Sequence, residues 1–432
     1  MPKSGGSREE LETVMDKIRR IAMGMASLSV FRGVLDRAVP GAFYRLLAAA
    51  GGPEEKFCGA WGAFFAALCE AGGCGDFARS LTEPVLSDEN AFSRAAAGGE
   101  EDFPPEMVAA AARDVSVLRE AAAVTPEDLL RSAGFPQDGR ELSLPAWRAG
   151  EPVPELRGDA RGCVSKLAGF YRRNGCGMYC RYRAFIWRGG EIRPVAHPDR
   201  TRLSDLKGYE AQRGMAVENT EGFLRGLPAN NCLLYGDRGT GKSSTVKALL
   251  NEYYPRGLRM IEIPKESLAD FPLLADRIAA LPLKFIVFID DLAFNREDDA
   301  YASLKAVLEG GLAARPENAL IYATSNRRHL VRETFSGREG DEVHRSDSIQ
   351  EGLSLYDRFG LSIRFTLPGR EQFLQIVHRL AEQRGLRVDA GELDRGAEKW
   401  ALTRGGRSPR CAKQYIRTVE ARVRAAENRG TD

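Results

Sequence analysis

The sequence lacks the features that would place it outside the ordinary globular proteins. It has no run of about 18 apolar residues, so no membrane-spanning helix is predicted. Its eight cysteines include no C-x-x-C pair, which argues against a disulfide framework or a zinc knuckle. Residues 1–12 are polar and do not resemble a secretory signal. We therefore expect a cytoplasmic protein with buried, reduced thiols and no membrane partner.

The chain also has little net charge. Its 62 basic and 60 acidic residues leave +2, so bulk charge does not argue for a nucleic-acid or membrane partner. The two signs are nevertheless segregated, because acidic residues predominate over 51–150 and basic residues over 151–200 and 401–432. At 432 residues, with 43% hydrophobic composition, the chain has the length for two or three domains.

The residue pattern divides the chain into four segments. Residues 1–160 are rich in Ala and Leu with helical periodicity, which predicts a helical domain. Residues 161–203 alternate aromatic residues with arginine around a Gly-Gly turn, which predicts a small basic β-hairpin connector. Residues 204–368 alternate short apolar runs with helical stretches, as βαβ units around a parallel sheet do. Residues 369–432 predict a helical lid.

The most specific motif is G-x-x-x-x-G-K-S at residues 236–243. Its glycines let successive backbone N–H groups turn toward one centre, Lys242 would reach the β and γ phosphates, and the Ser243 hydroxyl would ligate Mg²⁺. The motif follows an apolar run and precedes a helical one, whose amino end favours bound phosphate. The residues predicted to bind the nucleotide are Gly236, Asp237, Arg238, Gly239, Thr240, Gly241, Lys242, Ser243 and Ser244.

A pair of acids follows a second apolar run. Asp290 and Asp291 come directly after residues 285–289, and a buried parallel strand delivers such carboxylates to the edge where the phosphate loop lies. Asp290 is the candidate metal-side acid, acting with Ser243, and Asp291 the candidate to polarise or orient the attacking water. The alternative, that an Asp caps a helix, explains either residue alone but not the pair.

Two more polar residues stand next to predicted strands. Asn326 follows the strand 319–323 and could hold the water between Asp291 and the γ phosphate, or it could cap a turn. Arg358 precedes the last strand and could reach the γ phosphate of a neighbouring subunit. The alternative for Arg358 is an ion pair within the chain, for example with Asp357.

An arginine also opens the last predicted helix. Ser408 and Pro409 indicate a helix start, which places Arg410 in the first turn, where its charge does not favour the helix dipole. Contact with a bound γ phosphate would explain its presence. It could instead face solvent, and Arg404 or Arg407 could take the same role if the helix starts elsewhere.

The order of these motifs resembles that of the AAA+ ATPases. Within them the chain looks like a bacterial family of predicted ATP-binding proteins described only as a domain of unknown function, through the residues at 233–244, 308–312, 322–330 and 354–361. The AAA+ resemblance covers about 204–427. It implies an α/β fold with a five-stranded parallel sheet of order 5-1-4-3-2, a helical lid, bound ATP and Mg²⁺, and a ring-shaped or helical homo-oligomer.

The resemblance also implies roles for single residues. Lys242 and Ser243 correspond to the phosphate-loop lysine and magnesium ligand, and Asp290 and Asp291 to the acid pair. Asp291 stands where Glu is common, which favours slow turnover or a switch role. The remaining correspondences are Asn326 as sensor 1, Arg358 as the trans arginine finger, Arg410 as sensor 2, and Gly208 and Tyr209 in the segment that packs against adenine.

Three functions are then open. The first is an ATPase that remodels or loads an unidentified protein partner, with the helical N-terminal domain as partner module and residues 335–350 as a candidate mobile loop. The second is a nucleic-acid-associated ATPase that uses the aromatic and basic stretch 171–188, unless those aromatics face the core. The third is a small-molecule kinase or GTPase, against which the absence of an Asn-Lys-x-Asp motif argues.

Overall fold

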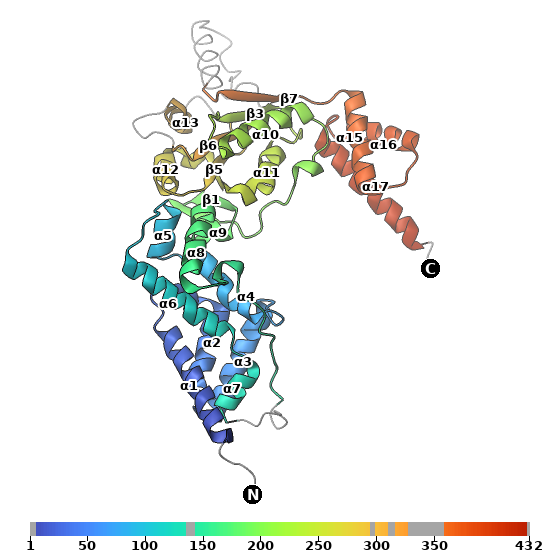
Figure 1. Ribbon diagram of the computed structural model, residues 1–432. Helices are drawn as coiled ribbons and strands as arrows, with labels where there is room; N and C mark the ends of the chain where they lie inside the picture. Colours follow the sequence, from blue (N-terminus) through green and yellow to red (C-terminus); the bar gives the residue numbers. More distant parts are fainter. Residues whose placement is uncertain (1–5, 135–142, 294–298, 310–315, 327–357, 430–432) are drawn as a thin grey trace. The chain divides into compact units, whose positions relative to one another are not determined.

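A computed structural model describes residues 6–134, 143–293, 299–309, 316–326 and 358–429. The chain divides into two compact units, Met1–Arg181 and Tyr182–Asp432 (Figure 1). Within the described ranges, no helix is both long and apolar enough to cross a membrane. The loop predicted at 335–350 lies outside them.

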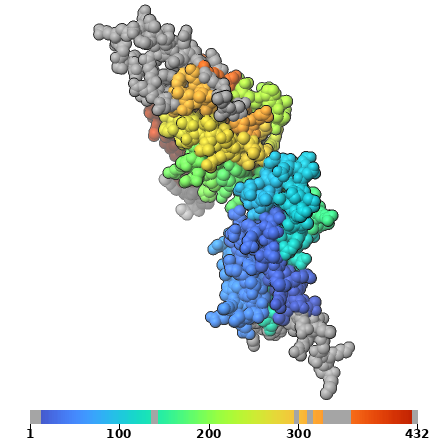
Figure 2. All heavy atoms as spheres, turned by 90° about the vertical axis from the view of Figure 1, so that its left-hand side faces the viewer, coloured from blue at the N-terminus to red at the C-terminus, as the bar shows by residue number. Residues whose placement is uncertain are grey.

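The first unit is helical, as its Ala- and Leu-rich sequence predicts. Its side chains gather into a body of their own, drawn blue to cyan in Figure 2. One core cluster is aromatic, with Phe43, Trp61, Phe64 and Phe77 buried around Trp147. The helices of this unit are α1 (Gly6–Ala26), α2 (Ala38–Ala49), α3 (Glu54–Glu70), α4 (Phe77–Thr82), α5 (Ala91–Ala97), α6 (Pro105–Ala122), α7 (Pro126–Ser132), α8 (Ala160–Asn174) and α9 (Gly177–Arg181).

A buried carboxylate fixes the turn after α1. Asp114 on α6 is fully buried and accepts backbone N–H hydrogen bonds from Ser29, Val30 and Phe31 at 2.8, 2.8 and 3.1 Å. Three such bonds satisfy a charge that burial alone would make costly. The acid therefore ties two helices distant in sequence.

The second unit is built on a seven-stranded sheet. The strand order is β2-β1-β4-β5-β6-β3-β7, and every pairing except that of β1 with β2 is parallel. Numbered along the chain, the five strands from β3 to β7 follow the order 5-1-4-3-2, which confirms the prediction. The strands are β1 (Ala184–Arg188), β2 (Glu191–Pro194), β3 (Cys232–Gly236), β4 (Leu258–Glu262), β5 (Lys284–Ile289), β6 (Ala319–Ser325) and β7 (Leu361–Phe365).

The hairpin corrects the predicted domain boundaries. Strand β1 pairs with β4 in parallel, so the hairpin extends the sheet instead of forming a separate connector over 161–203. Residues up to 181 belong to the first unit and those from 182 to the second. The hairpin covers the edge of β4, whose backbone groups would otherwise remain unpaired.

The hairpin also buries its aromatic side chains. Phe185 and Trp187 are 1% and 0% exposed, and Trp187 donates its indole N–H to Asp270 at 2.9 Å. In the first unit Tyr171 is fully buried, with its hydroxyl donating to the Val85 carbonyl. These rings cannot stack on bases, so at these positions the alternative is confirmed, in which the aromatic side chains face the core.

Helices cover both faces of the sheet and close the chain (Figure 1). Buried residues of α10 and α11 share one core cluster with β3 to β7, while α12 and α13 lie on the other side. The last three helices pack on one another as the predicted lid. The helices of this unit are α10 (Glu210–Leu224), α11 (Lys242–Tyr253), α12 (Phe271–Ala279), α13 (Asp299–Glu309), α15 (Arg370–Gln383), α16 (Ala390–Thr403) and α17 (Pro409–Arg429).

Candidate nucleotide-binding site

The strand register brings the predicted motifs to one edge of the sheet. Tyr235 of β3 lies opposite Ser325 of β6, and Ile289 of β5 lies opposite Ala323. The phosphate loop, the acid pair and Asn326 therefore leave their strands at the same level, because parallel strands end at a common carboxyl edge.

Close backbone packing requires glycine at the start of the phosphate loop. Gly236 has φ +124°, and a Cβ there would lie 2.0 Å from the Phe365 carbonyl oxygen on β7. The next residue donates its N–H to that same carbonyl at 2.8 Å. Any other residue would push the loop away from the sheet.

Lys242 is a buried cation that hydrogen-bonds to neutral groups. Its ammonium donates to the carbonyl oxygens of Gly236 and Asp237 and to Oδ1 of Asn326, at 2.9, 2.8 and 3.0 Å. Burial lowers its pKa to about 8, opposed by the charges of Asp237, Asp291 and Asp290, while the positive charge of Arg410 adds to the lowering. A nearby anion would therefore stabilise the protonated form of Lys242.

The predicted metal-side residues contact each other. Ser243 donates its hydroxyl to Oδ1 of Asp290 at 2.6 Å, and Thr324 donates to the same oxygen at 2.6 Å. A hydroxyl and a carboxylate at the foot of a phosphate loop are the oxygen donors that Mg²⁺ takes beside phosphates. The donor set fits that ion. In the described part of the chain, no cluster of three or more His, Cys, Asp and Glu side chains could hold a metal by itself.

The second acid is held by Asn326. The amide of Asn326 donates to Oδ1 of Asp291 at 2.5 Å, while its oxygen accepts from Lys242. Asp291 has φ +52°, an uncommon conformation for a residue with a side chain. Its backbone N–H donates to Thr324 Oγ1 at 3.0 Å, which helps hold it there. Asn326 thus links the lysine and the acid.

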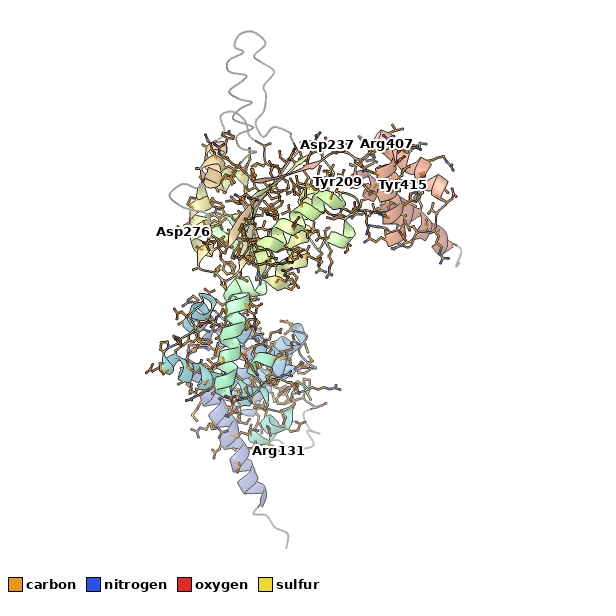
Figure 3. The ribbon with its side chains drawn as sticks, turned by 45° about the horizontal axis from the view of Figure 1, so that its top comes forward. Arg131, Tyr209, Asp237, Asp276, Arg407 and Tyr415 are labelled. Atoms are coloured by element: carbon orange, nitrogen blue, oxygen red, sulfur yellow. The ribbon has the colours of Figure 1, made fainter. Side chains whose placement is uncertain are left out.

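An aromatic residue stands at the other end of the site. Tyr209 has φ +60°, packs against Phe365 with ring centroids 5.2 Å apart, and donates its hydroxyl to the Thr366 carbonyl at 2.6 Å. Burial and the charge of Asp237 raise its pKa well above the usual value. Figure 3 shows Tyr209 and Asp237 close together.

The residue before it packs against the lid. Gly208 has φ +79°, and a Cβ there would lie 2.8 Å from Cδ1 of Ile376 on α15. Gly208 itself does not line the pocket, but Tyr209 and Ile376 do. The two predicted residues therefore have different roles. Gly208 permits close packing against the lid, whereas Tyr209 lines the pocket.

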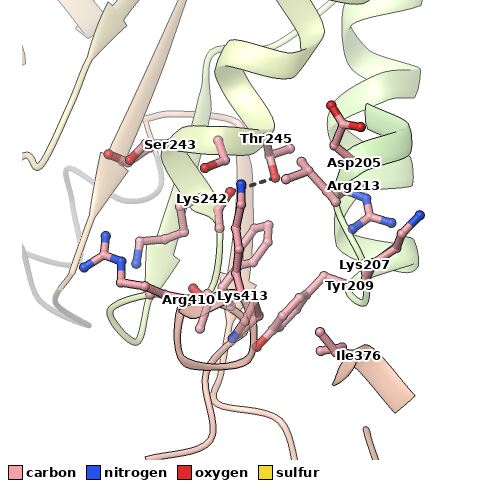
Figure 4. A pocket seen from close by; sticks show the side chains of 18 of the residues that line it. Asp205, Lys207, Tyr209, Arg213, Lys242, Ser243, Thr245, Ile376, Arg410 and Lys413 are labelled. Carbon is pink, nitrogen blue, oxygen red and sulfur yellow. Dashed lines mark hydrogen bonds between the residues drawn. The ribbon is translucent and has the colours of Figure 1, made fainter. Parts of the chain in front are cut away.

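The lid completes the site from the opposite side. Arg410 donates its backbone N–H to the Gly239 carbonyl at 3.1 Å, so α17 begins directly against the phosphate loop. Its side chain lies beside that of Lys242 (Figure 4). The alternatives Arg404 and Arg407 do not line the pocket; Arg407 pairs with Glu398 at 2.7 Å.

Sequence reasoning missed the rest of this helix face. Lys413, Gln414 and Arg417 also line the pocket, and their spacing of three, four and seven residues from Arg410 is the helical period that could have revealed them. The pocket has a volume of about 580 Å³, within the range of small-molecule sites. Its further lining includes Asp205, Leu206, Lys207, Arg213, Thr245, Thr324, Phe365, Ile376 and Leu380.

The predicted residues do not all reach the pocket. Residues 239–244, the acid pair, Asn326, Arg410 and Tyr209 line it, whereas Gly236, Asp237 and Arg238 do not. Arg358 lies in the turn before β7, at the amino end of a strand whose carboxyl end pairs with Gly236. A five-residue strand, about 16 Å long, separates it from the phosphate loop of its own chain.

The sheet order, the phosphate-loop sequence after β3 and the lid define a P-loop core of the AAA+ type. The chain belongs to a family described as "Protein of unknown function (DUF815)", whose model matches residues 180–423. No curated protein gave a significant match. The family assignment thus agrees with the predicted resemblance.

Solved structures with partial similarity include two named proteins. The RuvB Holliday junction branch migration motor of Thermotoga maritima is 16% identical with a TM-score of 0.33, over 51% of this chain and 63% of that one. AMPPCP-bound DnaA from Aquifex aeolicus is 15% identical with a TM-score of 0.38, over 52% and 67%. The chain thus spans less than two thirds of RuvB, and overlaps of this size say nothing about activity or partner.

Proposed function

We propose that the second unit binds Mg-ATP and hydrolyses it, and that an assembly of the chain uses this cycle to remodel or load a partner. The observation that carries the proposal is that two positively charged side chains, Lys242 and Arg410, lie next to each other in one pocket, which is also lined by the two acids. Two adjacent cations repel each other, and a polyphosphate would stabilise both.

The residues around this pair fit a magnesium triphosphate. Residues 239–244 and the amino end of α11 would hold the phosphates, Lys242 and Arg410 would neutralise them, and Ser243 and Asp290 would hold Mg²⁺. The ion would neutralise charge on the β and γ phosphates. Tyr209 and Ile376 supply an apolar surface for the base at the other end.

Asp291 and Asn326 form the hydrolytic pair of this proposal. Asp291 would orient the attacking water, and Asn326 would keep the carboxylate turned toward the γ phosphate through its 2.5 Å hydrogen bond. The oxygen of the same amide accepts a hydrogen bond from Lys242, so the position of the Asn326 side chain depends on both Lys242 and Asp291. A shorter acid than Glu supports slow or partner-stimulated turnover.

The position of Arg358 supports a role in trans. It stands at the opposite end of β7 from the phosphate loop, so it is poorly placed to reach a nucleotide bound by its own chain. In a homo-oligomer it would instead contact the γ phosphate bound by a neighbouring subunit. An arginine finger of this kind increases the rate of hydrolysis by a factor of about 10³ to 10⁵.

The helical first unit is the module we assign to the partner, which we take to be a protein. The nucleic-acid alternative loses its main support, because Phe185 and Trp187 are buried. The test is capture with Asp291→Asn, which should retain ATP without hydrolysing it and hold the partner, with Lys242→Ala as the matched variant that cannot bind ATP. Equal capture by both variants would contradict the proposal, and so would ATP hydrolysis by Asp291→Asn at the wild-type rate.

A further inference from the structure

Two cysteines of the first unit lie in contact. All eight cysteines fall in the described residues, and Cys69 is the exposed one among them. Its sulfur lies 2.8 Å from that of Cys74, which is half-buried. This contact is independent of the nucleotide site.

The local backbone produces the contact. Helix α3 ends at Glu70, and the chain turns back through Gly72, at φ +69°, with the N–H of Gly73 donating to the Leu68 carbonyl at 2.8 Å. This is the glycine-terminated turn that commonly ends helices. It returns Cys74 over the last turn of α3, beside Cys69.

Neighbouring contacts hold the turn in this form. A Cβ on Gly73 would lie 2.1 Å from the Ser80 hydroxyl oxygen, so the turn packs closely on α4. The Cys74 carbonyl accepts the N–H of Arg148 at 3.2 Å. Because both ends of the five-residue step are fixed, the two sulfurs meet without ordering any further chain.

We propose that Cys69 and Cys74 form a thiol–disulfide site that is oxidised by small-molecule disulfides of the glutathione type. The sulfurs would need to approach by less than 1 Å to reach the bond length of about 2.05 Å. The hydrogen bond from Cys74 is the main cause that raises the pKa of Cys69, which favours the thiol form of Cys69 in the reduced protein.

The thiol–disulfide exchange proceeds in two steps. The Cys69 thiolate attacks one sulfur of the small disulfide, forms a mixed disulfide and releases one thiolate. The Cys74 thiolate then attacks the Cys69 sulfur and releases the second. The two protein thiols lose two electrons and two protons, and the small disulfide becomes two thiols. Because Cys69 is exposed, it is the thiol that reacts first with the small disulfide, and Cys74 is the resolving thiol.

The test uses the full chain with oxidised glutathione, followed by alkylation of the remaining thiols and mass spectrometry. Before alkylation, the intact protein should be about 2 Da lighter. Under denaturing conditions, where all eight cysteines can react, six thiols should be alkylated and a Cys69–Cys74 linked peptide should appear, all reversed by dithiothreitol. Cys58→Ser, which removes the half-buried thiol of the same helix, should leave the link unchanged.

Two results would overturn the assignment. In one, wild-type protein keeps a stable glutathione adduct on Cys69 with no internal link. In the other, the loss of two thiols persists in both Cys69→Ser and Cys74→Ser. Thiol counts before oxidation report whether each variant is folded, because four of the eight cysteines are buried in the native protein.

Discussion

The carboxylate of Asp237 accepts the backbone N–H of Leu367 at 2.7 Å, and this bond joins the phosphate loop to the linker that leads into the lid. The same residue donates its own N–H to Phe365, and Tyr209 donates to Thr366 between them. The last residue of β7 and the first two residues of the linker are thus held from the nucleotide side. Lid position and phosphate-loop position are therefore physically coupled.

This coupling predicts different effects for two variants of one residue. Asp237→Ala removes the acceptor and should weaken ATP binding a few-fold, with about 1 kcal/mol lost from the free energy of unfolding. Asp237→Asn keeps an acceptor oxygen but removes the charge, so it should preserve most of the stability. Calorimetric titration and chemical unfolding measure the two quantities. Equal effects of both variants would show that charge, not the linker bond, matters.

The lowered pKa of Lys242 predicts a pH dependence with a defined sign. The folded, ligand-free protein binds fewer protons than the unfolded chain between pH 8 and 10.5, so its stability should rise with pH through that window. Bound phosphates favour the ammonium form, so ATP binding should take up almost no proton at pH 7 and nearly one at pH 9, and should weaken as pH rises above 8.

Titrations in buffers of different ionisation enthalpy measure this proton uptake. Lys242→Arg provides the control, because an arginine stays charged over the whole range and should take up no proton at either pH. The same uptake at pH 7 and pH 9 in the wild-type protein would refute a lysine pKa near 8.

The pocket-lining face of α17 predicts that charged residues outside the phosphate-loop motif contribute to ATP affinity. Lys413→Ala should lower ATP affinity a few-fold, and more at low than at high salt, because its charge lies in the pocket. Lys399→Ala removes an exposed lysine of α16 that does not line the pocket and is the matched control. The account of this face fails if the two variants bind ATP alike at low salt.

The trans role predicts a separation of binding from turnover. Arg358→Ala should bind ATP with wild-type affinity but lose the part of its hydrolysis rate that grows with protein concentration. The measurement is phosphate release per subunit across a range of protein concentrations. Normal hydrolysis by this variant at the highest concentration would exclude the finger role.

The core of the fold could be predicted because its signals are local. The phosphate loop at 236–243 and the acid pair after 285–289 each carry chemistry at fixed spacing, and a parallel sheet brings such strand ends together. The order of the five core strands followed from the AAA+ resemblance. Their meeting at one pocket was expected on the same grounds.

Other features depend on contacts that no local pattern reports. The hairpin around Gly189 was predicted, but its pairing with β4 depends on which sheet edge is open. The left-handed conformation of Tyr209 and the Cys69–Cys74 contact each depend on packing between segments. The pocket residues of α17 could have been predicted from their helical spacing, once Arg410 was assigned to the first turn of that helix.

The central claim is that this pocket binds Mg-ATP through Lys242. Calorimetric titration of the full chain with ATP in the presence of Mg²⁺ tests it most directly, alongside Lys242→Ala with its folding checked by thermal unfolding. The account predicts saturable binding at one site per chain in the wild-type protein and at least a hundredfold weaker binding in the variant, a loss of about 2.7 kcal/mol or more. Absence of binding in the wild type, or equal binding by the folded variant, would contradict it.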